Sequence, residues 1–152
     1  MEKQIKENPF DLYQVVAKCS DGDVLIGKDG KDVFNLNEAK AIQSEHQGLG
    51  AEVVLKPLDR KKTIIIIRKT LTENDNCPNY WKNNFEVKIT DKSIEIIADG
   101  RYHWIIETYD GYNYHACMFM NDNCCMYYAD LVFSQCVFDI LEELFDIEIS
   151  NK

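Results

Sequence analysis

Three short turn signals divide residues 85–120 into four segments of strand length. The turn signals are Asp91-Lys92, Asp99-Gly100 and Asp110-Gly111. Such polar pairs are typical of tight connections between antiparallel strands. In the first segment, Phe85, Val87 and Ile89 alternate with charged residues, which is the period of a strand with one buried face. The pattern therefore predicts a four-strand antiparallel meander.

After the meander the residues change to a helical period. Asp130 is a residue type that caps helices, and the helical pattern runs from there to Phe145. The residues expected to form its apolar face are Leu131, Val137, Phe138, Leu141, Leu144 and Phe145. Because apolar residues at such spacing lie on one face of a helix, we expect this helix to pack against the meander.

The first half of the chain contains further strand patterns. Residues 12–18, 24–26 and 51–56 have the composition and the bounding turns of strands. Residues 63–68 include four consecutive isoleucines, which predicts a central strand buried on both faces. These segments together predict a second, smaller sheet.

One short helix is predicted between these strands. Asn35, followed three residues later by Glu38, matches a capping box. Leu36, Ala39 and Ile42 keep helical spacing until glycines interrupt it at positions 48 and 50.

Residues 71–84 are polar, rich in asparagine and contain Pro78, a composition typical of a linker. Tyr80 and Trp81 are the large apolar residues that we expect to anchor it. We therefore predict an α+β protein of two small lobes, each an antiparallel sheet with one helix. The first lobe is residues 1–70, and the second, acidic lobe is residues 85–152.

Neither a membrane span nor a secretory signal is predicted. The chain has no run of about 18 apolar residues, and no apolar segment follows its charged start. The six cysteines are then expected to be reduced thiols rather than a disulfide framework. We accordingly predict a cytoplasmic protein.

The formal net charge is −9, and it is distributed unevenly along the chain. Residues 1–70 contain 12 Lys/Arg and 11 Asp/Glu, whereas residues 71–152 contain 5 and 15. Such an acidic surface repels nucleic-acid phosphates and attracts basic proteins, so we expect a basic protein partner and no direct nucleic-acid binding. The basic residues at 60–62, 68 and 69 are interpreted as keeping a strand edge soluble or pairing with the acidic lobe.

Four side chains with potential chemistry flank the turn at Asp110-Gly111: His103, Glu107, His115 and Cys117. A two-residue turn places Ile106 opposite His115 and puts the two histidines on opposite faces of the sheet. A three-residue turn with a glycine bulge places His103 opposite Cys117. In that register a thiolate nucleophile or a zinc site becomes possible.

Burial is the alternative role for the cysteines. Free cysteine is among the most frequently buried residue types. We therefore expect Cys117, Cys124, Cys125 and Cys136 to serve as small apolar side chains. The sequence has no Cys-x-x-Cys pair, nucleophile elbow or phosphate-binding glycine loop, and we predict no catalytic residue, metal or cofactor.

The last helix predicts a ridge of acidic side chains. Asp139, Glu142, Glu143 and Asp146 recur at helical spacing, which places four carboxylates on one face, opposite the apolar residues. Like charges at this spacing repel one another, and near a helix C-terminus they oppose the macrodipole. Because local stability does not require them, we interpret this acidic ridge as partner-binding, with the turn residues Tyr109 and Tyr112 as aromatic anchors.

In composition, a small acidic α+β chain with such a ridge and a tyrosine-rich surface resembles phage-encoded inhibitors of bacterial defence, in particular anti-CRISPR proteins. The resemblance covers the composition of residues 71–152 and no motif, so no functional residue is carried over from that class. It implies a non-enzymatic inhibitor that occupies a basic groove of a CRISPR effector in the cytoplasm of a bacterial host cell.

Two other functions stay open. The first is an immunity or antitoxin protein that neutralises a basic nuclease, since it would present the same acidic surface. The second is a small enzyme built on Cys117, His115 and His103.

Overall fold

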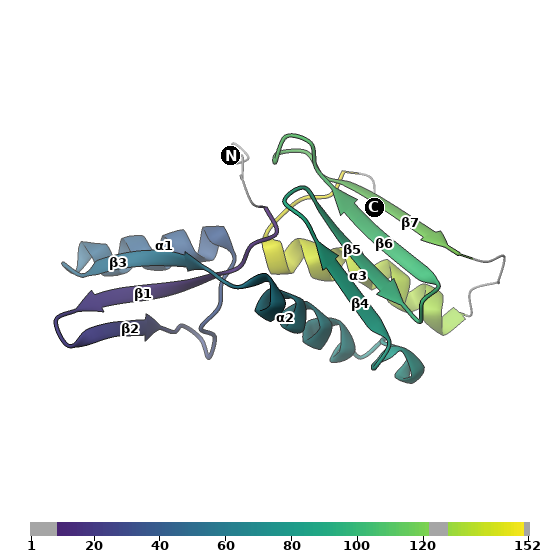
Figure 1. Cartoon of the computed structure of the whole chain (residues 1–152), viewed down its shortest axis with the longest axis horizontal. Coiled ribbons are helices and arrows are strands. Elements are labelled where there is room, and N and C mark those ends of the chain that lie inside the picture. The colour runs from purple at the N-terminus through teal and green to yellow at the C-terminus, as the bar shows by residue number, and fades with distance from the viewer. Residues whose placement is uncertain (1–8, 122–127, 151–152) are drawn as a thin grey trace. The chain divides into compact units, whose positions relative to one another are not determined.

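The computed structural model describes residues 9–121 and 128–150, drawn in colour in Figure 1. Their contacts divide the chain into two compact units. Asp11–Thr63 is the N-terminal unit, and residues 9–10 together with residues 64–150 are the C-terminal unit. The predicted α+β class is confirmed, with three α-helices in the described part of the chain.

The N-terminal unit contains a three-stranded antiparallel sheet in the order β2-β1-β3. Its strands are β1 (Tyr13–Cys19), β2 (Gly22–Ile26) and β3 (Glu52–Pro57). Each lies within two residues of a predicted strand. The helix α1 (Leu36–Gly48) lies between β2 and β3 in the chain, as predicted.

The capping box of α1 is present. The Asn35 side chain accepts a hydrogen bond from the Glu38 backbone N–H at 2.9 Å, and the Glu38 carboxylate accepts one from the Asn35 N–H at 3.2 Å. The buried core of the unit joins α1 to one face of the sheet and consists of Val15, Phe34, Ala39, Ile42 and Val53. The local start signal and the apolar spacing therefore agree with the packing.

Residues 63–68 do not form a strand, so that prediction is wrong. They lie in α2 (Arg60–Thr72). Asp59 begins this helix, because its carboxylate accepts the Lys61 N–H at 2.7 Å and its carbonyl accepts the Thr63 N–H at 3.0 Å. Thr63, Ile67 and Leu71 are buried and recur every four residues, which is a helical period. Branched isoleucines favour strands locally, but burial at this spacing decided the structure.

The basic residues 60–62 consequently form the first turn of α2 and do not lie at a strand edge. Positive charge at a helix N-terminus opposes the macrodipole. The expected role in keeping a strand edge soluble is therefore wrong for these residues.

The segment predicted as a linker, residues 71–84, is built around a buried tryptophan. It contains the end of α2 and a 3₁₀ turn, η1 (Asn79–Trp81). Trp81 is fully buried. Its ring centroid lies 5.0–6.4 Å from those of Tyr102, Phe133, Trp104 and Phe85. This segment supplies a central part of the core of the C-terminal unit.

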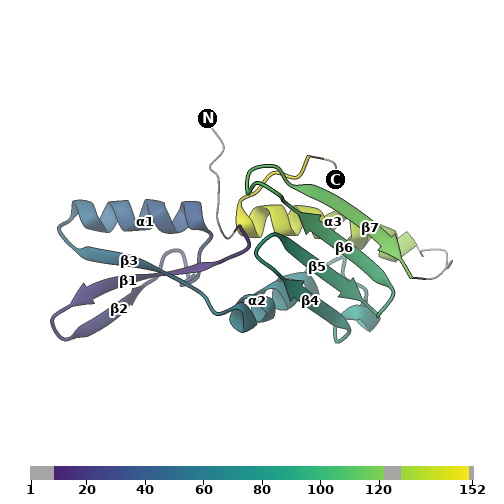
Figure 2. The same cartoon turned by 45° about the horizontal axis from the view of Figure 1, so that its top comes forward.

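The C-terminal unit contains the predicted four-strand meander, which is confirmed. Its strands are β4 (Phe85–Ile89), β5 (Ser93–Ala98), β6 (Tyr102–Glu107) and β7 (His115–Met120). They are antiparallel and lie in the order β4-β5-β6-β7. Figure 2 shows α3 (Tyr128–Phe145) behind this sheet.

Helix α3 begins at Tyr128, two residues before the predicted cap, so Asp130 lies inside the first turn and the capping prediction is wrong. Phe133, Val137, Leu141 and Phe145 are buried at intervals of four residues. Phe133 contacts Trp81 and Phe85, which places this face of α3 against the sheet as expected. None of the helices in residues 9–121 and 128–150 is long and apolar enough to cross a membrane.

Candidate acidic interaction site

The connection between β6 and β7 spans residues 108–114 and is longer than either predicted turn. The Asp110 carboxylate accepts hydrogen bonds from the Tyr112 and Asn113 backbone N–H groups, both at 2.8 Å. The buried Thr108 hydroxyl accepts one from the Gly111 N–H at 2.9 Å. Gly111 has a φ of 72°, which glycine adopts without strain because it has no Cβ. These bonds give residues 108–113, the 108–113 loop, one defined conformation.

The pKa of Asp110 predicts how this loop responds to acid. The Asn113 and Tyr112 backbone N–H groups stabilise the ionised carboxylate and lower its pKa to about 2. An unfolded aspartate has a pKa of about 3.9. The contribution of Asp110 to stability is therefore fully present above pH 4 and is lost as the pH falls from about 4 to about 2. An NMR titration of the side-chain carboxyl should report the low value, and a midpoint near 3.9 would contradict these bonds.

The C-terminal end of α3 is closed by Glu142. Its backbone carbonyl accepts a hydrogen bond from the Ile147 N–H at 3.1 Å. Asp146, the residue before Ile147, adopts the left-handed conformation with a φ of 52°. This is a Schellman-type helix end, with aspartate at a position that usually holds glycine. The Glu142 carboxylate also accepts the Ile149 N–H at 2.7 Å. Glu142 therefore positions residues 147–150, the tail that follows α3.

The tail connects the end of α3 with the end of the 108–113 loop. Ile149 forms a parallel bridge with Tyr114, and the Ser150 N–H donates to the Tyr114 carbonyl at 3.1 Å. The Tyr114 hydroxyl donates to the Gly111 carbonyl at 3.2 Å. Burial and the charge of Asp110 raise the pKa of Tyr114 to about 12, so this hydroxyl keeps its proton.

The ring of Phe10 adds a second connection at the same place. It packs edge-to-face against Tyr114 and Phe145, with centroids 6.1 and 5.8 Å apart. The 108–113 loop and the last turn of α3 are therefore held at the same end of the C-terminal unit. We call this region, residues 107–113 with residues 139–148, the acidic end.

The predicted site residues all belong to the acidic end, with different exposure. Asp139, Glu143 and Asp146 are exposed, and Glu142 is half-buried. Tyr109 is 83% exposed, whereas Tyr112 is half-buried. The structure thus brings the predicted tyrosine turn and the predicted acidic ridge to one region, which their separation in the sequence did not show.

Three further carboxylates lie in the acidic end and were not predicted: Glu107, Asp110 and Glu148. All three are exposed. Residues 102–151 contain nine Asp/Glu and neither lysine nor arginine. This charge count was available in the sequence, but the grouping of these residues required the pairing of the tail with Tyr114.

The β6–β7 register differs from both predicted registers. Glu107 pairs with His115, Ile105 with Cys117 and His103 with Phe119. His103, Glu107, His115 and Cys117 do share one face, because paired residues and every second residue point to the same side. However, His103 is not opposite Cys117, so the geometry expected for a Cys-His site is wrong.

The histidines instead have partners of their own. His103 stacks on Phe119 at 4.4 Å between centroids, and its Nδ1 lies 3.4 Å from the Glu95 carboxylate. His115 Nδ1 lies 3.4 Å from the Ser150 hydroxyl. In the residues that the structure covers, no group of three or more His, Cys, Asp and Glu side chains is arranged to hold a metal ion.

The expected burial of the cysteines is only partly correct. Cys117 is exposed, so that prediction is wrong for this residue, and Cys136 is half-buried with its Sγ 3.4 Å from the Val132 carbonyl. Cys124 and Cys125 lie outside the described residues. Cys77, in the segment predicted as a linker, is buried, and this burial raises the pKa of its thiol.

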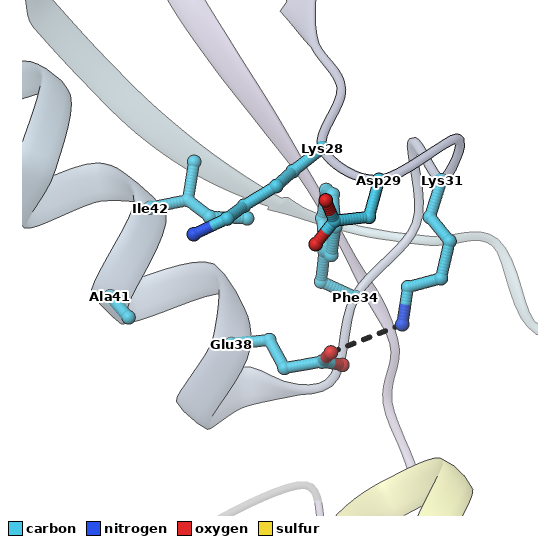
Figure 3. Close-up of a pocket in the computed structure, with 7 residues that line it drawn as sticks. All are labelled: Lys28, Asp29, Lys31, Phe34, Glu38, Ala41 and Ile42. Atoms are coloured by element: carbon cyan, nitrogen blue, oxygen red, sulfur yellow. Dashed lines mark hydrogen bonds and ion pairs between the residues drawn. The ribbon is translucent and has the colours of Figure 1, made fainter.

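A cavity of about 350 Å³ lies in the N-terminal unit, beside α1 (Figure 3). It is lined by Lys28, Asp29, Lys31, Phe34, Glu38, Ala41 and Ile42. Lys31 pairs with Glu38 at 3.0 Å and lies 5.6 Å from the centre of the Phe34 ring. Two lysines and two carboxylates lie in this lining, so its formal charges sum to zero.

Comparisons of the chain with protein-family models, with curated proteins and with solved structures found no match.

Proposed function

We propose that this chain is a non-enzymatic binding protein whose acidic end occupies a basic, nucleic-acid-binding surface on a bacterial defence protein. The observation that carries the proposal is the composition of the acidic end, whose residues include seven Asp/Glu and neither lysine nor arginine. One exposed lysine, Lys92, lies beside it, since its carbonyl accepts the Thr108 N–H at 2.9 Å. Surfaces that are merely soluble usually mix charges of both signs. A surface on which acidic residues predominate is suited to a basic partner.

Two of these carboxylates have a defined structural role. Glu142 binds the tail and Asp110 shapes its loop. Asp139 and Glu143 are exposed on α3, and Glu143 lies in its last turn, where a carboxylate is unfavourable by about 0.3–1 kcal/mol. Because their carboxylates are exposed, we assign to Asp139 and Glu143 the role of substituting for nucleic-acid phosphates, supported at the helix end by the exposed Asp146.

Tyr109 is the aromatic anchor in this proposal. It is the most exposed large hydrophobic side chain at the acidic end, and the hydrogen bonds of Asp110 and Thr108 fix the loop that carries it. A pre-organised tyrosine loses little entropy on binding and is a frequent hot spot. Tyr112 is half-buried and contributes a smaller contact.

The class of partner rests on the resemblance in composition to anti-CRISPR proteins. The inhibitor would act in the cytoplasm of a bacterial host cell and compete with DNA or guide RNA for a CRISPR effector. An immunity protein against a basic nuclease toxin would use the same surface, so basic nucleases belong in the test panel. Capture of a nuclease toxin and of no CRISPR effector would identify the chain as an immunity protein instead of an anti-CRISPR inhibitor.

Two exposed carboxylates of α3 allow a matched test. The variant Asp139→Lys/Glu143→Lys should bind the captured effector about 10–100-fold more weakly, because the attraction between these carboxylates and basic groups of the partner becomes a repulsion between like charges. The control Glu73→Lys/Asp75→Lys changes the charge by the same amount at two other exposed sites of the C-terminal unit. Binding is measured by surface plasmon resonance after pull-down from a panel of effectors and basic nucleases.

Salt provides the second arm of that experiment. Wild-type binding should weaken as the salt concentration rises, because exposed charge pairs are screened. Equal losses in both variants would show that only net charge matters and would remove the α3 carboxylates from the interface. Capture of no member of the panel would contradict the proposed partner class.

A further inference from the structure

Strand β7 lacks the protection that the other sheet edges have. The two sheets end in β2, β3, β4 and β7. Charged residues occur in the first three, namely Asp23 in β2, Glu52 and Lys56 in β3, and Glu86 and Lys88 in β4. β7 has the sequence HACMFM and carries none. Because charged side chains on an edge strand oppose pairing with another chain, β7 is the edge best suited to such pairing among the described strands.

The same strand exposes large apolar side chains. Met118 is 37% exposed and Phe119 is 41% exposed, and their neighbour Cys117 is exposed as well. Both views of the molecule show β7 as the outermost strand of its sheet (Figures 1 and 2). An edge strand with exposed apolar side chains and no charged residue is a template for a further strand.

The hydrogen-bond pattern shows which backbone groups face outward. The Asn121 N–H donates to the Arg101 carbonyl at 3.0 Å and continues the β6–β7 ladder. Because inward and outward positions alternate along an antiparallel strand, Phe119 faces β6, whereas Met118 and Met120 turn their N–H and C=O groups to the outer side. Tyr114 lies an even number of positions from Met118, so its backbone groups also face the outer side. Its carbonyl accepts the Ser150 N–H on that side. The outer side of this edge therefore already accepts one backbone segment.

We propose that β7 pairs with β7 of a second copy of this chain, antiparallel and about a two-fold axis at Phe119. In this register Met118 bonds to Met120 of the second copy, and the two Phe119 side chains lie opposite each other. The pairing needs only residues 118–120, so the tail stays in place at Tyr114.

Charge favours a second copy over a basic strand as the occupant. A basic strand would need acidic residues along β7 to select it, and β7 has none. An uncharged strand, in contrast, can pair with itself without placing like charges opposite each other. Glu107 and His115 lie at one end of the β6–β7 pair, and Tyr102 and Met120 lie at the other. Antiparallel pairing of two β7 strands therefore puts the two acidic ends at opposite ends of the joined sheet.

The dimer would have one continuous eight-stranded sheet and two acidic ends. An isologous contact of this kind closes after two copies and leaves no further β7 edge exposed. Two acidic ends on one particle could engage two basic sites of a partner, which raises the apparent affinity without new contacts.

The oligomeric state of the full chain tests the proposal by sedimentation velocity over a concentration series. We expect a monomer–dimer equilibrium for the wild type. Phe119→Lys should weaken dimerisation at least about tenfold, because two lysines would face each other. Gln135→Lys, an equal charge change at an exposed position of α3, should leave it unchanged. Salt should not weaken the dimer, in contrast to the proposed partner binding.

A cross-linking variant tests the register directly. Residues opposite each other in a non-hydrogen-bonded pair have Cα atoms about 4.5 Å apart, which a disulfide can span. Phe119→Cys should therefore form a disulfide dimer under mild oxidation at least about tenfold faster than the wild type, in which Cys117 falls opposite Asn121. This readout remains informative if Phe119→Lys proves unstable by circular dichroism.

Three outcomes would overturn the proposal. They are a monomeric wild type at all concentrations, a dimer that Phe119→Lys does not weaken, and a Phe119→Cys variant that cross-links no faster than the wild type. A monomeric wild type whose partner binding is weakened by Phe119→Lys would show instead that β7 accepts a strand of the partner.

Discussion

Replacement of Trp81 by alanine is expected to lower the free energy of unfolding of the C-terminal unit by about 3–5 kcal/mol, the usual cost of removing a buried large aromatic side chain. Trp81, in η1, is fully buried and contacts four other aromatic rings, which come from β4, β6 and α3. Its removal leaves a cavity where these elements meet. Urea unfolding followed by circular dichroism measures the change.

Trp81→Phe is the matched control for this prediction. It keeps an aromatic ring and most of the volume, so the loss should be clearly smaller than for alanine. A loss below about 1 kcal/mol for Trp81→Ala would show that residues 79–81 do not pack in the core, as expected for a true linker.

Replacement of Ile67 by alanine is expected to cost about 2–5 kcal/mol, whereas Ile65→Ala should change stability by less than about 0.5 kcal/mol. Ile67 is fully buried, while Ile65 is 59% exposed. The two substitutions remove the same atoms from the same run of isoleucines. Their difference in unfolding free energy therefore reports burial alone.

The Ile65 and Ile67 pair also discriminates between the two structures that the sequence permits. Both residues lie on the same face of a strand, because side chains alternate with a period of two. In a strand the two substitutions would have similar effects. In α2 they lie about 200° apart around the helix axis, so equal losses would contradict the helix.

The N-terminal strands, α1 and the meander could be predicted from the sequence because their signals are local. Asn35 and Glu38 satisfy each other within one helical turn. In β4, Phe85 and Val87 alternate with charged residues and are buried as the period requires. Residues 63–68 could not be assigned in this way, because a run of isoleucines satisfies both a buried strand and a helix.

The candidate site was predictable in part. The spacing of Asp139, Glu142 and Glu143 identified an acidic face on a helix, but it could not show that the Glu142 carboxylate binds the Ile149 N–H. That contact depends on the path of the tail, which is fixed by its bridge to Tyr114. The sequence identifies Asp110 as a turn residue, and only the conformation of its loop shows why the pKa of its carboxyl is lowered.

The α+β class, the four-strand meander and the excess of acid after residue 70 follow from the amino-acid order alone, because they depend on local period and on composition. The tertiary structure decided that residues 63–68 are helical, that His103 stacks on Phe119, and that the tyrosine turn and the end of α3 share one region. Each of these features depends on burial or on hydrogen bonds between residues that are distant in the chain. The sequence of one segment does not specify which other segment will pack against it.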